Sequence, residues 1–69
     1  MVFFLHIEPT EHYLEFHKRE VPWEKVIEVM FSTKDPRKKG DKFEISNKGY
    51  YLLFEVKNSV AYVINAKRE

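Results

Sequence analysis

Basic side chains gather in the second half of the chain, and their chemistry is the most suggestive in the sequence. Lys and Arg bind phosphate groups, and exposed tyrosines can stack on bases. The candidate RNA-binding residues lie in or beside the segment 32–41, and two more cations end the chain's last apolar run: Lys34, Arg37, Lys38, Lys39 and Lys42, then Lys67 and Arg68. With Tyr50, Tyr51 and Tyr62 downstream, they indicate an RNA-binding surface. A solvated lysine-rich loop and a frayed C-terminus account for them equally well.

Three histidines, His6, His12 and His17, are the candidates for proton transfer or metal binding. His12 and His17 are five residues apart, about 500° around a helix, so they do not share a face as an i, i+4 metal pair would. The chain has no cysteine and no HExxH pattern, and its two glycines are too few for a phosphate-binding loop. The sequence therefore predicts neither a metal site nor a cofactor.

Length and composition indicate one small globular domain, residues 1–69. Hydrophobic residues make up 43% of the chain, charged residues 33% and aromatic residues 16%, which is enough apolar surface for a core. No apolar run approaches the roughly 18 residues of a membrane span, and the opening residues lack the basic start of a signal peptide. We therefore expect a cytoplasmic protein with no membrane partner.

The charge is distributed unevenly along the chain. The net charge is +1 overall, but residues 1–33 carry −3 and residues 34–69 carry +4. This asymmetry predicts a bipolar surface with one pole able to meet a polyanion. Glu and Lys are abundant and Gln is absent, a composition that weakly resembles that of thermophile proteins.

The first half of the chain is expected to form one strand and two helices. Residues 2–8 are β-branched and aromatic and are followed by Pro9, as in a strand. Thr10 is a good helix N-cap, so a helix is expected over 11–19. A second helix is expected to begin at Pro22 and to end near residue 31. Its spacing of three and four predicts that one stripe packs on the sheet: Trp23, Val26, Ile27, Met30 and Phe31.

The second half is expected to contain one loop and three strands. Pro36 and Gly40 mark residues 32–41 as a loop, and strands follow over 42–46, 50–57 and 60–66. Short turns around Gly49 and at Asn58-Ser59 separate these strands. The sequence therefore predicts an α+β fold with the order β-α-α-β-β-β, an antiparallel sheet and two helices packed on one face.

Two segments resemble a known family. Residues 18–29, KREVPWEKVIEV, resemble the corner between the helices of small BrnT-like proteins, which reads basic–x–hydrophobic–Ser/Pro–x–Glu–x–Val. Residues 62–68, YVINAKR, look like the terminal strand R-I-I-S-A-R-R of those proteins, with Tyr62 in place of the first arginine. BrnT proteins belong to the RelE-like group of toxin ribonucleases, so the resemblance implies that fold and an RNA substrate.

The resemblance also implies a set of candidate catalytic residues. In RelE-like enzymes without a strong base, cations stabilise the phosphate in the transition state, which suits Lys67 and Arg68. His12 or Tyr62 would transfer the proton. A small antitoxin-like protein would be the partner. The alternative is a non-catalytic interaction module that forms a homodimer or binds a protein partner, because a fold by itself does not fix an activity.

Overall fold

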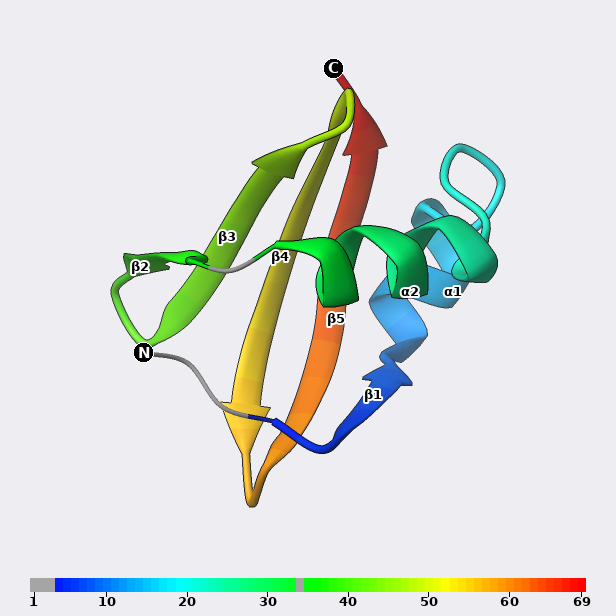
Figure 1. Ribbon diagram of the computed structural model, residues 1–69. Coiled ribbons are helices and arrows are strands. Elements are labelled where there is room, and N and C mark those ends of the chain that lie inside the picture. Colours follow the sequence, from blue (N-terminus) through cyan, green and yellow to red (C-terminus); the bar gives the residue numbers. More distant parts are fainter. Residues whose placement is uncertain (1–3, 34) are drawn as a thin grey trace.

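One five-stranded sheet and two helices make up the fold, seen in a computed structural model that describes residues 4–33 and 35–69 (Figure 1). The strands stand side by side in the order β1-β5-β4-β3-β2, and both helices lie on one face of the sheet. The elements follow the chain as β1 (His6–Pro9), α1 (Glu11–Phe16), α2 (Trp23–Ser32), β2 (Arg37–Lys39), β3 (Lys42–Asn47), β4 (Tyr50–Lys57) and β5 (Val60–Arg68). The predicted α+β class with two helices on one face is confirmed.

The sheet is mixed, so the prediction of an antiparallel sheet is wrong in one pairing. Strand β1 runs parallel to β5, with Ile7 opposite Ala61, while β2 to β5 are antiparallel neighbours. The reason is the connection: the chain leaves β1 through both helices before β2 to β5 form, and it returns beside β1 in the same direction. A parallel neighbour requires such a long crossover.

The predicted loop 32–41 contains an additional strand, β2, so the predicted element order lacked one strand. Residues Arg37–Lys39 pair with Lys42–Glu44 of β3 across a two-residue turn. Gly40 opens that turn with a φ of 65°, a conformation in which glycine carries no steric cost. A three-residue run of basic side chains has no apolar alternation, so the sequence carries no strand signal there.

Tight turns fix the register of the remaining strands. Lys48 and Gly49 both have positive φ between β3 and β4, and Asn58 and Ser59 do so between β4 and β5. Two consecutive positive φ values are typical of the type I′ turn, whose twist matches that of antiparallel strands. The predicted turns and the three C-terminal strands are therefore confirmed.

The first helix is shorter than predicted and ends at Phe16 instead of Arg19. Thr10 caps it, as predicted, because its hydroxyl accepts a hydrogen bond from the Tyr13 amide. At the other end, the Tyr13 carbonyl accepts from the amides of both His17 and Lys18, which takes the chain out of the α-helical path.

The core lies between the helices and the sheet. Strands β3, β4 and β5 direct alternate side chains toward the helices, and the helices contribute a narrow buried stripe. The buried residues of the whole core are Tyr13, Val21, Val26, Val29, Met30, Ile45, Leu52, Phe54, Ala61, Val63 and Ala66. The predicted stripe of α2 is therefore partly wrong: Ile27 and Phe31 are 38% and 64% exposed, whereas Val29 is buried. Trp23 is half-buried against the Tyr13 ring.

Among residues 4–33 and 35–69, no helix is both long enough and apolar enough to cross a membrane.

Candidate nucleic-acid interface

The face of the sheet away from the helices carries the aromatic and basic side chains that could bind RNA. Because side chains alternate along a strand, the burial of Leu52 and Phe54 toward the helices sends their neighbours on β4 to the other face. The same alternation holds on β3 and β5 around Ile45 and Val63. We call this surface the open face; it carries Arg37, Lys39, Lys42, Glu44, Tyr51, Leu53, Glu55, Lys57, Tyr62, Ile64 and Lys67.

At the β2 side of the open face, two cations share one carboxylate. Glu44 Oε1 lies 3.2 Å from a guanidinium nitrogen of Arg37, and Glu44 Oε2 lies 3.9 Å from Nζ of Lys39. The Tyr51 hydroxyl donates to the same carboxylate at 2.8 Å. One glutamate compensates only one of the two positive charges, so a net positive charge remains for a phosphate group.

At the β4 side of the open face, the charges balance. Lys57 Nζ lies 3.0 Å from Glu55, and Lys42 Nζ lies 3.9 Å from Glu55 and 3.2 Å from Asp41. The hydrogen bond and charge of Lys42 lower the pKa of Asp41, and those of Glu55 raise the pKa of Lys57. The two basic and two acidic side chains therefore compensate one another.

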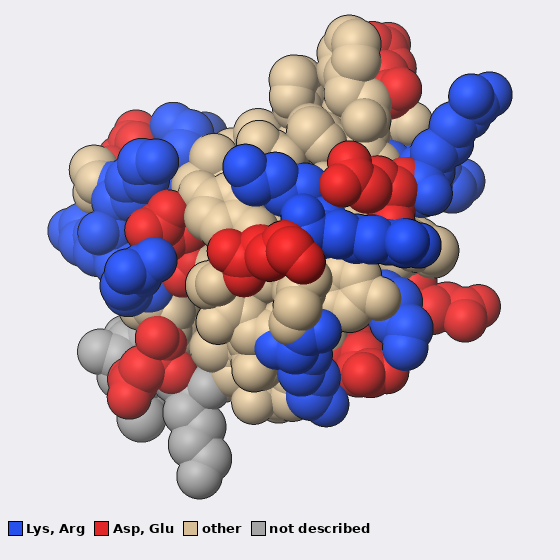
Figure 2. Space-filling model, turned by 90° about the horizontal axis from the view of Figure 1, so that it is seen from above, with Lys and Arg blue, Asp and Glu red and all other residues tan. Residues whose placement is uncertain are grey.

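Basic and acidic side chains are also interleaved where the chain ends. Seen from the side that holds the C-terminus, no area carries a single sign of charge (Figure 2). The bipolar distribution along the sequence is thus not matched by a uniformly charged face in that view.

Tyr51 and Lys67 form a cation–π pair at the C-terminal end of the open face. Nζ of Lys67 lies 5.2 Å from the centroid of the Tyr51 ring, within the range for such a contact. Burial, followed by the hydrogen bond to Glu44, raises the pKa of Tyr51, so its hydroxyl stays protonated. Lys67 has no carboxylate partner within salt-bridge distance among the described residues, which leaves its charge available.

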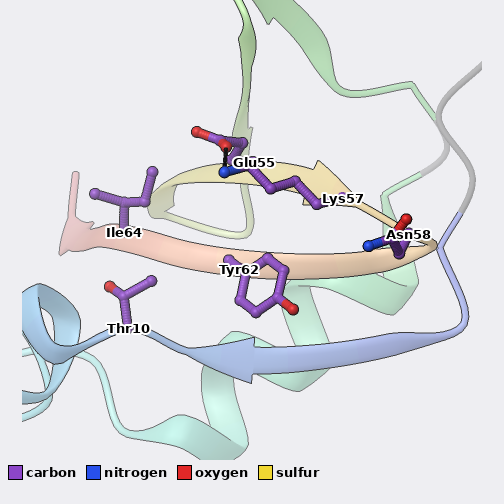
Figure 3. Close-up of a pocket in the computed structure, with 6 residues that line it drawn as sticks. All are labelled: Thr10, Glu55, Lys57, Asn58, Tyr62 and Ile64. Carbon is purple, nitrogen blue, oxygen red and sulfur yellow. Dashed lines mark ion pairs between the residues drawn. The ribbon is translucent and has the colours of Figure 1, made fainter.

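A shallow hollow of about 410 Å³ lies beside Tyr62 (Figure 3). A bulge shapes it: Leu53 pairs with Asn65 and Phe54 pairs with Val63, so Ile64 is an extra residue on β5. The ring of Tyr62 and the Glu55–Lys57 ion pair lie on the same side of the sheet. The lining residues are Thr10, Glu55, Lys57, Asn58, Tyr62 and Ile64.

The predicted RNA-binding residues divide between two faces. Arg37, Lys39 and Lys42 lie on the open face, where Arg37 pairs with Glu44 across β2 and β3. Lys38 stands opposite Phe43, so its backbone position belongs to the helix-covered side. Lys34 lies outside the described residues.

The predicted catalytic residues are not brought together. Tyr62 and Lys67 share the open face but are five residues apart on one strand, roughly 16 Å at about 3.3 Å per residue. Arg68 stands opposite Tyr50 on the other side, and its backbone amide donates to the Glu20 carboxylate at 3.0 Å. His12 belongs to α1, in the helical layer. A general base must lie within hydrogen-bond reach of its proton, so these four residues do not form one catalytic centre.

No family model, curated protein or solved structure matches the chain.

Several open-face residues were not singled out by the sequence. Leu53, Glu55 and Lys57 alternate with the buried residues of β4, so the period of two within 50–57 was the signal that could have found them. Thr10 reaches the hollow from the junction of β1 and α1, where its hydroxyl donates to the Val63 carbonyl at 2.8 Å. No local sequence pattern predicts this contact, because Thr10 and Val63 are far apart in the sequence.

Proposed function

We propose that the protein binds single-stranded RNA on the open face of its sheet. The observation that carries the proposal is the placement of two half-buried tyrosines, Tyr51 and Tyr62, on neighbouring strands of the open face. They lie toward opposite ends of this face, because Tyr51 stands opposite Lys67 and Tyr62 opposite Glu55, and neither described helix covers it. Sheets that present aromatic rings in this way stack unpaired bases in known RNA-binding modules. Each base has a π-face, so stacking tolerates many sequences.

The charges around these rings support the same proposal. Lys67 lies over Tyr51, and Arg37 and Lys39 share the Glu44 carboxylate. The Glu69 carboxylate also lies at this end and accepts from the Ser46 hydroxyl, so three cations face two carboxylate side chains here. Phosphate groups of a strand stacked on the tyrosines would meet those cations. Counterion release from the bound strand would then contribute to affinity.

Ribonuclease activity of the RelE or BrnT type is the stronger form of this proposal. It rests on the resemblance of residues 62–68 to the terminal strand of BrnT-like proteins, and it would include an antitoxin-like protein partner. The separation of Tyr62 from Lys67 favours binding without cleavage, because the two groups are too far apart to act at one phosphate.

Fluorescence anisotropy of a labelled ten-nucleotide RNA at low salt tests the proposal. Replacing Tyr62 by Leu keeps an apolar side chain and removes the stacking ring, so affinity should fall about 5- to 150-fold. Phe16→Leu is the matched control, since Phe16 is an aromatic residue 65% exposed on the helical layer. Equal affinities of the wild type and Tyr62→Leu, or an equal loss in both variants, would contradict the proposal.

The same RNA also tests the stronger form. Cleavage by the wild type that is lost in a Lys67→Ala/Arg68→Ala variant would establish a ribonuclease, and binding without cleavage would limit the function to recognition. Absence of binding at low salt would favour the interaction module. The exposed side chains Ile27 and Phe31 of α2 would then be the first to replace in a search for a partner.

A further inference from the structure

The two histidines of the first helix lie against each other. Helix α1 ends at Phe16, and His17 follows with a φ of −126°, outside the helical range. The ring centroids of His12 and His17 are consequently 5.0 Å apart, although five residues of continuous helix would have separated them. The expectation that the two histidines do not share a face is therefore wrong.

His17 is held with one ring nitrogen free to act as a ligand. Its Nε2 atom is buried and makes no hydrogen bond with any residue of the described chain. The backbone of Ala66, on β5, lies beside the ring. A neutral imidazole with its proton on Nδ1 carries a lone pair on Nε2, and histidines bind metal ions through such a lone pair.

The spacing of the two rings fits a shared metal ion. Two imidazoles bound to one tetrahedral ion at about 2.0–2.1 Å per Zn–N bond have centroids roughly 5 Å apart. His12 is exposed on α1, so its ring is free to turn a nitrogen toward Nε2 of His17.

We propose that His12 and His17 together bind a divalent transition ion such as Zn²⁺. Imidazole nitrogens suit Zn²⁺, Ni²⁺ and Cu²⁺, whereas Mg²⁺ prefers oxygen ligands. No group of three or more metal-binding side chains lies together in the described residues, so water completes the coordination. Since His17 contacts β5 through Ala66, the ion would fasten the end of α1 beside the sheet. A domain this small and without disulfides gains stability from such a ligand.

Isothermal titration of the full chain with Zn²⁺ at pH 7.5 tests this site. We expect one ion per chain, and at least about a tenfold loss of affinity in His12→Ala, since even outer-shell substitutions cost 10–100-fold. His6→Ala is the matched control, because His6 lies on β1 and is the remaining histidine. Mg²⁺ at the same concentration should not bind, and Zn²⁺ should bind more weakly as the pH is lowered, because protons compete with the ion for imidazole nitrogens.

Two results would overturn the proposal: absence of Zn²⁺ binding at millimolar concentration, or equal affinity in wild type and His12→Ala. Equal loss in His6→Ala and His12→Ala would do the same, because it would point to unspecific binding. His12 is exposed, so its replacement leaves the core intact and the comparison does not depend on a damaged fold. In the wild type, imidazole NMR signals of His12 and His17 should shift with Zn²⁺, while those of His6 should stay in place.

Discussion

Tyr13 joins the first helix to the segment that leads into the second. Its side chain is fully buried, and its hydroxyl donates to the Val21 carbonyl at 2.7 Å. Burial raises the pKa of Tyr13, which keeps the hydroxyl protonated as a donor. Val21 is itself buried, so its carbonyl depends on this one side chain for satisfaction.

Replacing Tyr13 by Phe should lower the free energy of unfolding by about 1–3 kcal/mol, because a buried acceptor loses its donor while the ring remains. Urea denaturation followed by circular dichroism measures this change. Tyr50→Phe is the control, since the Tyr50 side chain makes no hydrogen bond with the residues the structure describes. A Tyr13→Phe variant as stable as Tyr50→Phe would show that the hydroxyl contributes nothing.

His17 should make stability depend on pH. Burial and His12 lower its pKa below 6.5 in the folded state, while Ala66 and Glu20 oppose the shift. Between the lowered folded value and 6.5, the unfolded chain binds more protons, so acidification favours unfolding. The stabilising contribution is therefore present above pH 6.5 and is lost as the pH falls through the folded pKa.

Thermal unfolding in metal-free buffer at several values between pH 5 and 8 measures this dependence. His17→Gln should flatten the profile in that window, whereas His6→Gln should leave the wild-type shape. A His17→Gln profile that still falls steeply below pH 6.5 would assign the effect to another group.

The orientation of α2 shows how far a helical pattern determines packing. The spacing predicted five apolar residues on the buried side, but a two-layer fold covers only one stripe of each helix. The structure centres that stripe on Val26 and Met30 and adds Val29, while Ile27 lies at its border. The apolar periodicity predicts that a helix is present. It does not predict how the helix is rotated about its own axis, because that rotation is set by contacts with β3 to β5.

Met30→Ala and Ile27→Ala should therefore differ in cost. Met30 is 2% exposed, so its truncation leaves a cavity and should lower the free energy of unfolding by about 2–5 kcal/mol. Ile27 is 38% exposed, and its truncation should cost under about 1 kcal/mol. Chemical denaturation measures the loss in free energy of unfolding for both variants. Equal losses would support the predicted stripe, in which Ile27 is as buried as Met30.

Elements with strong local signals were predictable, and elements defined by distant contacts were not. Turn residues at Gly49 and Asn58 and the apolar strands between them gave the β3–β4–β5 meander. Strand β2 exists because basic residues 37–39 pair with β3, and the early end of α1 depends on the Tyr13 carbonyl. Neither has a signature within its own segment.

For the whole molecule, the cations of the candidate site were predictable, but their partners were not. Sequence composition counts Arg37 and Lys39 as free positive charges, whereas the register of β2 on β3 brings both to Glu44. The electrostatic field that a polyanion meets is therefore set by strand pairing. Net charge alone, +1 for the chain, says little about it.

This pairing leads to a prediction of increased affinity. Glu44→Gln removes the carboxylate that Arg37 and Lys39 share and keeps an amide oxygen for the Tyr51 hydroxyl. One more uncompensated cation should tighten RNA binding roughly five- to tenfold at 0.1 M salt and steepen the salt dependence by about one unit. Glu24→Gln makes the same change of net charge on α2, in the helical layer, and should leave binding close to wild type. Anisotropy titrations at several salt concentrations, with circular dichroism to check folding, compare the two variants. Equal tightening in both would mean that RNA responds to net charge alone, and the open face would then have no special role.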